Sequence, residues 1–384
     1  MKKPSSLRKY HILLTVRHPV GGIRTFLRYV YNHFDPSAYR FTLLLPETSE
    51  HKALVEDLEP IHPSYIVLPP RSTAFDFEKK LFYLLTTQKI DLVHSHGLAT
   101  GALTALPAFL TRTPHIVTQH DMFTDGLVVG IKGYWLRKGL SFLLGFANVI
   151  HSVGHDAKAN LIQYLPGLAR KKDRIVVIPN GIDVERFDRA PRMDLRRHLG
   201  LSEGTFLIGF LGRFMSQKGF RYLVDAVEIL AKDDALPKEM TVVTFGWGGF
   251  IREDMAMVKE RGLDRYFRSM PFVSNIAPAL KGLDVVAIPS IWEAGPILPL
   301  EAMVAGVPVI GTDCVGLREV LKDTPSVVVP AQDSLTLAEA IYAEMKNPSR
   351  FKAEKFREEA ARRFDVRNQA VELEKTMLGL ILRK

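Results

Sequence analysis

Residues 206–230 read FLIGFLGRFMSQKGFRYLVDAVEIL, and this segment combines two different periodic patterns. Its first part, 206–212, has the length and the apolar, aromatic content of a buried strand. Its last part, 220–230, carries apolar residues at helical spacing, and a short loop joins the two parts. A buried strand that leads through a short loop into an amphipathic helix is typical of βαβ units. The stretch therefore predicts an α/β fold built on a parallel sheet.

Similar apolar runs, separated by longer amphipathic segments, occur along the whole chain. In the first half they are 11–16, 41–45, 64–68, 91–95, 115–119, 148–152 and 174–178. In the second half they are 206–212, 240–246, 284–290, 307–313 and 326–330. The segment 185–204 between the two sets is polar and contains Pro and Gly, which is typical of a linker. We therefore predict an N-terminal domain at 1–190, a second domain at 191–364 and a C-terminal helix at 365–384.

The composition is that of a globular protein: 384 residues, of which 47% are hydrophobic and 24% charged, with a mean hydropathy of +0.03. This length suits two domains, and this balance excludes disordered and collagen-like chains. The single cysteine, Cys314, excludes an intramolecular disulfide, a thiolate zinc site and an iron–sulfur cluster. The uncharged runs 92–111 and 139–155 are too interrupted or too short to span a membrane. We expect a cytoplasmic protein.

The net charge of +9 is concentrated in the first half of the chain. Residues 1–190 hold 24 Lys and Arg against 16 Asp and Glu, whereas 191–384 hold 27 against 26. This asymmetry suits nucleic acid, a membrane surface or a phosphorylated ligand, but no zinc-finger or RNA-binding motif accompanies it, so we expect no nucleic-acid partner.

One basic segment, 126–146, mixes Lys132, Arg137 and Lys138 with aromatic and aliphatic residues. Such a segment can lie in a membrane interface, which would place the protein peripherally on the cytoplasmic face of the membrane. Alternatively, it is an ordinary crossover helix packed on the sheet.

Ligands of open α/β sheets bind beyond the carboxyl ends of the strands, so the loops there are the places to search. Arg213 and Lys218 lie in the loop after the run 206–212, just before a helix. Backbone N–H groups, the helix dipole and two cations together can hold a diphosphate, although incidental charge on a solvated loop is the alternative.

A pair of glutamates marks the loop that follows the run 284–290. Glu293 lies in this loop, and Glu301 lies in the first turn of the next helix. Carboxylates accept hydrogen bonds from hydroxyl-rich ligands, so the pair indicates a ligand site. Glu301 could instead be a surface residue that stabilises the helix dipole.

Weaker signals follow three other strands. Gly21-Gly22, after the first strand, would allow close approach to a ligand or close packing of the next helix. His120 follows the run 115–119, where it could bind a hydroxyl, although a lone histidine is more often structural. Gly246 begins a GWGG turn that could contact a nucleotide. For His94, His96 and His155 we favour structural roles.

In chain order the motifs are Gly21-Gly22, DLVHSHG (91–97), His120, IPNGID (178–183), GRFMSQKG (212–219), GWGG (246–249) and EAGPILPLEAMVAGVPVIGTD (293–313). This ordered set resembles glycosyltransferase family 4 over nearly the whole chain. Members are retaining GT-B enzymes with two facing Rossmann-like domains and a C-terminal helix that returns to the N-terminal domain. The sequence departs from the family where many members have Glu-Gly-Phe-Gly, because it has Glu-Ala-Gly-Pro at 293–296.

The resemblance implies a transferase that moves a hexosyl group from a UDP- or GDP-sugar to a glycan or lipid-linked acceptor of cell-surface polysaccharide or glycolipid synthesis. It implies no cofactor and no metal, because the two cations would stabilise the leaving diphosphate. The implied catalytic residues are His120, Arg213, Lys218 and Glu293. The implied donor-binding residues are Gly21, Gly22, Arg213, Lys218, Gly246, Glu293, Gly295, Pro296, Ile297, Leu298 and Glu301.

Two other functions stay open on the same scaffold. One is a non-catalytic protein that binds a sugar nucleotide, and the other is a GT-B epimerase or hydrolase of nucleotide sugars. A nicotinamide dehydrogenase is disfavoured because no strand is followed by Gly-x-Gly-x-x-Gly.

Overall fold

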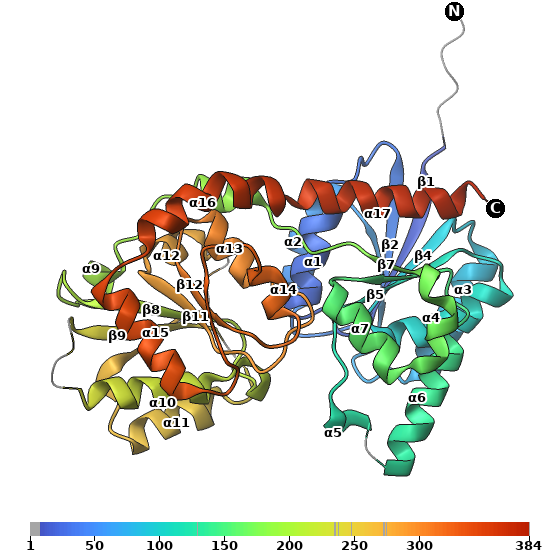
Figure 1. Ribbon diagram of the computed structural model, residues 1–384. Helices are drawn as coiled ribbons and strands as arrows, with labels where there is room; N and C mark the ends of the chain where they lie inside the picture. Colours follow the sequence, from blue (N-terminus) through green and yellow to red (C-terminus); the bar gives the residue numbers. More distant parts are fainter. Residues whose placement is uncertain are drawn as a thin grey trace, which may run out of the picture. The chain divides into compact units, whose positions relative to one another are not determined.

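The computed structural model describes residues 8–128, 130–233, 236, 238–246, 248–271, 273 and 275–383. The chain divides into two compact units (Figure 1). Unit 1 comprises Met1–Gly181 and Val366–Lys384, and unit 2 comprises Ile182–Asp365.

The first boundary lies earlier than the predicted one after residue 190 and therefore corrects it. The physical reason is that the backbone N–H of Ile182 already donates to the carbonyl of Phe364, at 2.8 Å, within unit 2. The helix that follows, α8 (Val184–Asp188), contacts other helices of unit 2. The polar segment thus packs as part of unit 2 and is no free linker.

Unit 1 is built on a seven-stranded, all-parallel sheet with the order β3-β2-β1-β4-β5-β6-β7. The strands are β1 (Tyr10–Val16), β2 (Tyr39–Pro46), β3 (Ser64–Leu68), β4 (Leu92–His96), β5 (His115–Gln119), β6 (Val149–Ser152) and β7 (Ile175–Val177). Its helices are α1 (Gly22–Tyr31), α2 (His51–Asp57), α3 (Ala74–Thr87), α4 (Leu98–Leu110), α5 (Asp125–Val128), α6 (Gly130–Leu144), α7 (His155–Tyr164) and α17 (Val366–Ile381), with 3-10 turns η1 (Glu59–Ile61) and η2 (Pro166–Arg174). Each apolar run predicted in this half is a strand.

Unit 2 is built on a six-stranded, all-parallel sheet with the order β10-β9-β8-β11-β12-β13. The strands are β8 (Phe206–Leu211), β9 (Met240–Phe245), β10 (Phe267–Met270), β11 (Val285–Ile288), β12 (Val309–Thr312) and β13 (Val327–Val329). Its helices are α8, α9 (Leu195–Leu199), α10 (Phe220–Ala231), α11 (Ile251–Glu260), α12 (Ala277–Gly282), α13 (Leu298–Val304), α14 (Leu317–Leu321), α15 (Ser334–Lys346) and α16 (Arg350–Arg363), with 3-10 turns η3 (Ser216–Lys218) and η4 (Asp264–Tyr266).

Residues 206–230, which form β8, the following loop and most of α10, lie at the centre of unit 2. Every residue of β8 is buried, and α10 buries six of its twelve residues. Phe210, Phe214 and Phe220 pack against one another with ring centroids 4.9 to 5.5 Å apart, so aromatic contacts fix the loop between β8 and α10 onto the core.

Both sheets reverse their strand order at an internal point. In unit 1 the reversal lies between β1 and β4, and in unit 2 it lies between β8 and β11. Two parallel sheets with helical crossovers confirm the predicted α/β architecture of two Rossmann-like domains. The loops at the carboxyl ends of these four strands are the ligand sites that this topology favours.

The last helix, α17, belongs to unit 1, as the predicted return of the C-terminal helix requires (Figure 1). The backbone N–H of Gly181 donates to Oε1 of Gln369 at 2.9 Å, and Nε2 of Gln369 donates to Oδ1 of Asn180 at 3.2 Å. The Asn-Gly turn after β7, which alone indicated only a turn, therefore anchors α17. Gln369 itself is buried.

Within the described residues no helix has the length and apolar character needed to cross a membrane. The run 92–111 is β4 followed by α4, and 139–155 covers the end of α6 and all of β6. Cys314 is a free, buried cysteine, and burial raises the pKa of its thiol to about 11.

Candidate active site

The loop between β8 and α10 places two predicted residues at the switch point of unit 2. Nζ of Lys218 contacts both carboxylate oxygens of Glu293, at 2.7 and 3.0 Å. Arg213 is partly exposed and forms no hydrogen bond or ion pair with any residue that the structure describes. Lys218 is thus held by the Glu293 carboxylate of the neighbouring loop, whereas the guanidinium of Arg213 is available to a ligand.

Glu293 is a buried carboxylate with several partners. Its side chain is 6% exposed, and Oε1 also accepts a hydrogen bond from Oγ of Ser290 at 2.6 Å. Its backbone N–H donates to the carbonyl of Val315 at 2.9 Å. A buried charge is tolerated when it is paired and hydrogen-bonded, so Lys218 and Ser290 together hold this carboxylate in place. Sequence reasoning missed Ser290, because nothing distinguishes one serine of a strand-end loop from another.

The loops around this pair are in backbone contact. Gly219 has φ 67°, and a Cβ placed on it would lie 1.9 Å from the carbonyl oxygen of Pro289. The N–H of Ile291 donates to the carbonyl of Gln217 at 2.8 Å. Glycine at position 219 is therefore required for the loop after β8 to meet the loop after β11.

Gly246, the first residue after β9, lies against the same loop. A Cβ placed on Gly246 would lie 1.8 Å from the carbonyl oxygen of Gly212. Close packing of backbone on backbone explains this glycine, and its contact with a nucleotide stays a prediction.

The remaining donor-binding candidates of unit 2 follow Glu293 directly along the chain. Gly295, Pro296 and Ile297 join it to α13, of which Leu298 is the first residue. Glu301 lies in the first turn of α13 and is partly exposed, where the sequence placed it. Pro299 near the start of the helix suits this position, because proline has no N–H to leave unsatisfied there.

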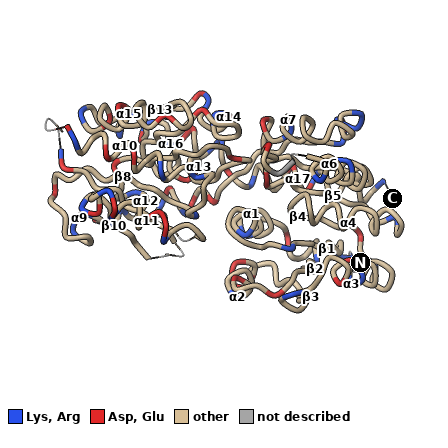
Figure 2. Tube along the Cα trace, turned by 90° about the horizontal axis from the view of Figure 1, so that it is seen from below, with Lys and Arg blue, Asp and Glu red and all other residues tan. Residues whose placement is uncertain are grey.

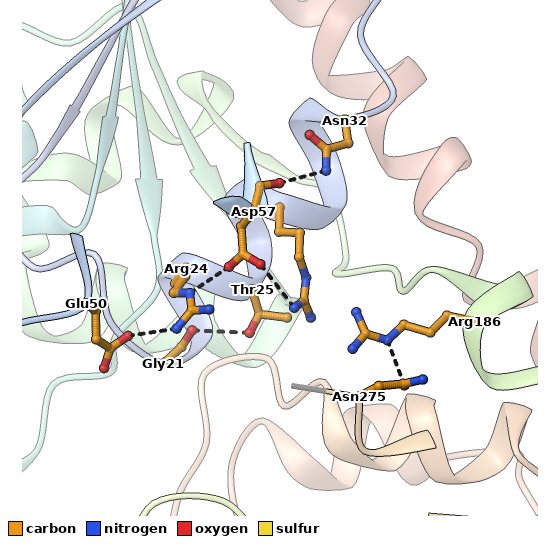
Figure 3. Close-up of polar contacts among 9 residues, drawn as sticks. Gly21, Arg24, Thr25, Asn32, Glu50, Asp57, Arg186 and Asn275 are labelled. Atoms are coloured by element: carbon orange, nitrogen blue, oxygen red, sulfur yellow. Dashed lines mark hydrogen bonds and ion pairs between the residues drawn. The ribbon is translucent and has the colours of Figure 1, made fainter. Parts of the chain in front are cut away.

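In unit 1, Gly21 lies between β1 and α1, and Gly22 is the first residue of α1. Gly21 has φ 57° and ψ −127°, a conformation open to glycine. A Cβ on Gly22 would meet nothing within 4 Å, so helix packing does not explain this second glycine. Oγ1 of Thr25 donates to the carbonyl of Gly21 at 3.2 Å, which fixes the turn onto the helix (Figure 3).

The first turns of α1 carry arginines that sequence reasoning missed. Nε of Arg24 lies 2.6 Å from Asp57, its Nη1 lies 3.4 Å from Glu50, and Arg28 also reaches Asp57 at 3.4 Å (Figure 3). Asn32, directly after α1, donates to the backbone carbonyl of the same aspartate at 3.0 Å. These contacts join α1, the helix that follows the glycine turn, to the end of α2.

Figure 3 also draws a polar contact that belongs to unit 2 alone. Nε of Arg186 donates to Oδ1 of Asn275 at 3.2 Å, which joins α8 to the segment before α12.

His120 follows β5 directly and is partly exposed. Its Nε2 lies 3.2 Å from Nδ1 of His96, and the ring of Phe26 meets it edge-on with centroids 4.9 Å apart. Burial lowers the pKa of His120 to about 3, so the ring is neutral at physiological pH. A neutral imidazole at the end of a strand offers one donor and one acceptor, but no charge.

Of the three histidines for which we expected structural roles, two are buried and one is exposed. His94 and His96 on β4 are 0% and 1% exposed, which agrees with the structural roles expected for them. His155 is the first residue of α7 and is exposed.

Comparison with known proteins agrees with this arrangement. The model of "Glycosyltransferase Family 4" matches residues 20–186, and that of "Glycosyl transferases group 1" matches residues 205–347. The chain belongs to the glycosyltransferase family that these two models describe. The two matched ranges correspond to unit 1 without its first strand and C-terminal helix, and to the larger part of unit 2.

Two curated relatives illustrate the similarity of this chain to glycosyltransferases. A UDP-Gal:alpha-D-GlcNAc-diphosphoundecaprenol alpha-1,3-galactosyltransferase of Escherichia coli is 28% identical over 251 residues, 63% of this chain and 63% of that protein. A D-inositol 3-phosphate glycosyltransferase of Xylanimonas cellulosilytica is 33% identical over 280 residues, 68% of this chain and 64% of that protein. Each match therefore spans less than two thirds of the relative's length.

Solved structures show the same fold over nearly the whole chain. Anabaena HepE, crystallised with UDP and glucose, has a TM-score of 0.82 at 20% identity and covers 96% of this chain and 100% of its own. Sucrose-phosphate synthase of Thermosynechococcus elongatus has a TM-score of 0.78 at 18% identity, with coverage of 98% and 100%. The chain thus has the GT-B fold expected from its motifs.

Proposed function

We propose that the protein transfers a sugar from a nucleoside-diphosphate sugar to a glycan or lipid-linked acceptor, with retention of the anomeric configuration and without a metal ion. The observation that carries the proposal is the pair of cations at the switch point of unit 2. Arg213 has no partner among the described residues, and Lys218 is shared with Glu293.

The reaction needs stabilisation of the charge that develops on the leaving group. The bond between the anomeric carbon and the phosphate oxygen breaks, and the diphosphate leaves with the bonding electrons. Arg213 and Lys218 pair with this diphosphate, while the departing phosphate oxygen takes the proton of the attacking acceptor hydroxyl. The Lys218–Glu293 ion pair fixes the position of the lysine before the donor arrives, so little reorganisation is needed.

The donor and acceptor classes are proposed from the relatives. HepE was crystallised with UDP, with UDP and glucose, and with UDP-glucose, and the name of the E. coli relative gives UDP-Gal as donor and a diphosphoundecaprenol-linked sugar as acceptor. We therefore propose a UDP-sugar donor, with a GDP-sugar as the second choice, and an acceptor with a lipid diphosphate in cell-surface polysaccharide or glycolipid synthesis.

An exposed apolar and basic surface on unit 1 supports a membrane-borne acceptor. Of the described residues of α6, only Gly133 and Leu144 are buried, whereas Ile131, Trp135 and Phe142 are 80%, 67% and 66% exposed. At the end of α4, Phe109 and Leu110 are 57% and 63% exposed. An ordinary crossover helix would bury such side chains, so the alternative of a helix packed on the sheet explains α6 poorly.

Charge strengthens this interpretation of α6. The helix holds Lys132, Arg137 and Lys138 and no acidic residue (Figure 2). Aromatic and basic side chains on one helix suit the interface of an anionic bilayer. We propose that α6 and the end of α4 rest on the cytoplasmic face of a membrane, where a lipid-linked acceptor would be found.

The test has two steps. A thermal-shift screen of UDP-, GDP- and ADP-sugars selects the donor, and release of the nucleoside diphosphate is then followed with and without an acceptor that carries a lipid diphosphate. Release that depends on the acceptor supports the transferase. Binding without turnover would support a non-catalytic binding protein, and release without the acceptor would support a hydrolase.

A further inference from the structure

A continuous chain of hydrogen bonds runs through the interior of unit 1 and ends at His120. The joined atoms are Ile178 O and His151 Nε2 (2.8 Å), His151 Nδ1 and Thr118 Oγ1 (3.0 Å), Thr118 Oγ1 and His94 Nε2 (2.6 Å), His94 Nδ1 and Tyr31 OH (2.7 Å), Tyr31 OH and His96 Nε2 (3.0 Å), and His96 Nδ1 and His120 Nε2 (3.2 Å). Every side chain before His120 is at most 1% exposed. We call Tyr31, His94, His96, Thr118 and His151 the histidine relay.

The imidazole rings in this chain are neutral at physiological pH. Burial lowers the pKa of His94 and His96 well below the usual value, and it lowers the pKa of His151 to about 4. A neutral ring carries one N–H donor and one bare nitrogen that accepts. Each ring can therefore donate at one nitrogen only.

The carbonyl of Ile178 sets the direction of the chain, because a carbonyl only accepts. Nε2 of His151 must therefore carry the proton, and its Nδ1 is bare. The hydroxyl of Thr118 has one hydrogen and must donate it to this bare nitrogen. The oxygen of Thr118 then accepts from Nε2 of His94.

The remaining hydrogen bonds, from His94 to His120, have fixed directions as well. Nδ1 of His94 is bare, so it accepts from the hydroxyl of Tyr31. The tyrosine oxygen then accepts from Nε2 of His96, whose Nδ1 is bare. The last bond is therefore donated by Nε2 of His120. One arrangement of protons alone makes every contact a hydrogen bond, and it leaves Nδ1 of His120 without a proton.

The free nitrogen of His120 is held at the carboxyl end of β5. Among the described residues, His120 forms a hydrogen bond only through Nε2. Its ring stacks on that of His96, with centroids 5.4 Å apart and 28° between the planes, and Phe26 packs on it edge-on. These contacts fix the plane of the ring as well as its tautomer.

We propose that the histidine relay consists of positioning residues, which hold His120 as the Nε2–H tautomer so that its Nδ1 accepts a hydrogen bond from a sugar hydroxyl of the substrate. The identity of the substrate rests on the proposed function, whereas the tautomer rests on the geometry of unit 1 alone. The relay thereby makes His120 a hydrogen-bond acceptor at Nδ1.

The tautomer can be read directly. In protein labelled with 15N-histidine, long-range 1H–15N correlation spectra distinguish a protonated from a bare ring nitrogen. We expect a bare Nδ1 and a protonated Nε2 for His120 at pH 7, assigned with His120→Gln. In Tyr31→Phe the relay is cut next to His96, and in Thr118→Val it is cut further inside, so both should shift His120 toward a mixture of tautomers.

Ser95→Ala is the matched control. Ser95 lies between His94 and His96 on β4 and is buried, but its hydroxyl bonds to Thr15 and His115 outside the relay. This variant should leave the His120 spectrum unchanged. A protonated Nδ1 in the wild type, or an unchanged His120 tautomer in both folded relay variants, would overturn the proposal.

A kinetic measurement separates positioning from donor binding. Tyr31→Phe should lower kcat about three- to tenfold, the loss expected for one misaligned hydrogen bond, while the Kd of bare UDP in calorimetry is unchanged. An unchanged kcat in a variant with a shifted tautomer would overturn the role in substrate binding. If the wild type transferred no sugar at all, the proposed function would fail, but the spectra would still decide the relay.

Discussion

Arg213 and Lys218 lie five positions apart in the segment between β8 and α10, yet only Lys218 has a partner among the described residues. We expect Arg213→Ala and Lys218→Ala each to lower donor turnover about ten- to a hundredfold, because a charge-assisted hydrogen bond contributes about 1.5–3 kcal/mol. Steady-state kinetics with the selected donor are the measurement. Arg221→Ala, which removes an exposed arginine from α10, is the control, and near-normal turnover in both site variants would remove the diphosphate assignment.

Replacing Glu293 and replacing Glu301 by alanine should impair different properties of the protein. Glu301, in the first turn of α13, should bind the ribose, so Glu301→Ala should weaken binding of the bare nucleoside diphosphate more than Glu293→Ala does. Glu293→Ala should mainly lower turnover and the discrimination between donor sugars, because it removes the partner of Lys218. Calorimetry measures the affinity of the two variants for UDP. Equal losses of affinity in Glu301→Ala and Glu293→Ala would contradict these separate roles.

At the residue scale, sequence reasoning predicted where the charged candidates lie but not what they contact. The loop of Arg213 and the helix turn of Glu301 follow from strand ends and helix starts, which local patterns reveal. The bond from Ser290 to Glu293 and the relay from Tyr31 to His120 could not be predicted. They depend on the distances between side chains brought together by the tertiary structure, which local spacing does not encode.

At the scale of elements, the alternation of apolar runs predicted every strand except β10. Its sequence, FRSM, has four residues, of which only the first is buried. It lies at the edge of the sheet and pairs with β9 alone. An edge strand needs little apolar content because one side and part of its faces meet solvent, so composition gives no signal for it.

The helix α6 gives a prediction of its own. Replacement of Lys132, Arg137 and Lys138 by Glu should abolish binding to anionic vesicles, because each basic residue near such a surface contributes about 1 kcal/mol. Binding of the wild type should weaken as salt is added, since salt screens these charges. Cosedimentation with vesicles rich in anionic lipid is the measurement.

The matched control for α6 reverses the same amount of charge in unit 2. Lys259, Lys352 and Lys355 are exposed, and their replacement by Glu should leave vesicle binding unchanged. Wild-type protein that stays in the supernatant at low salt would contradict membrane docking by α6. The acceptor would then have to be soluble.

On the scale of the molecule, the two units differ in charge and in histidine content. Unit 1 holds 26 Lys and Arg against 15 Asp and Glu, whereas unit 2 holds 25 against 27. Eleven of the twelve histidines lie in unit 1. Moving the boundary to Gly181 and adding α17 thus sharpens the asymmetry that the sequence indicated, because both changes concentrate positive charge in unit 1.

The buried histidines should make unit 1 sensitive to acid. The pKa of His151 is about 4 in the folded protein against 6.5 as its usual value, so the unfolded chain binds more protons between these values. The contribution of the neutral His151 to the free energy of unfolding of unit 1 is therefore fully present above about pH 6.5, and it is lost as the pH drops toward 4. A single such group lowers the free energy of unfolding by about 2 kcal/mol at pH 5.

The change in stability with pH can be measured for each unit separately by hydrogen exchange at pH 7 and pH 5, corrected for the intrinsic exchange rates. Protection of β4, β5 and β6 should fall at pH 5. The strands of unit 2 serve as the internal control, because the one histidine of that unit, His198, is exposed. Equal protection of unit 1 at the two pH values would contradict buried, neutral histidines.

Retaining transfer from a nucleotide sugar can be tested by proton NMR of the first product formed. The reaction contains the donor selected by thermal shift, an acceptor that carries a lipid diphosphate, and EDTA. We expect one glycosidic product for each nucleoside diphosphate released, with the anomeric configuration of the donor. A product of inverted configuration, or free sugar released without the acceptor, would contradict it.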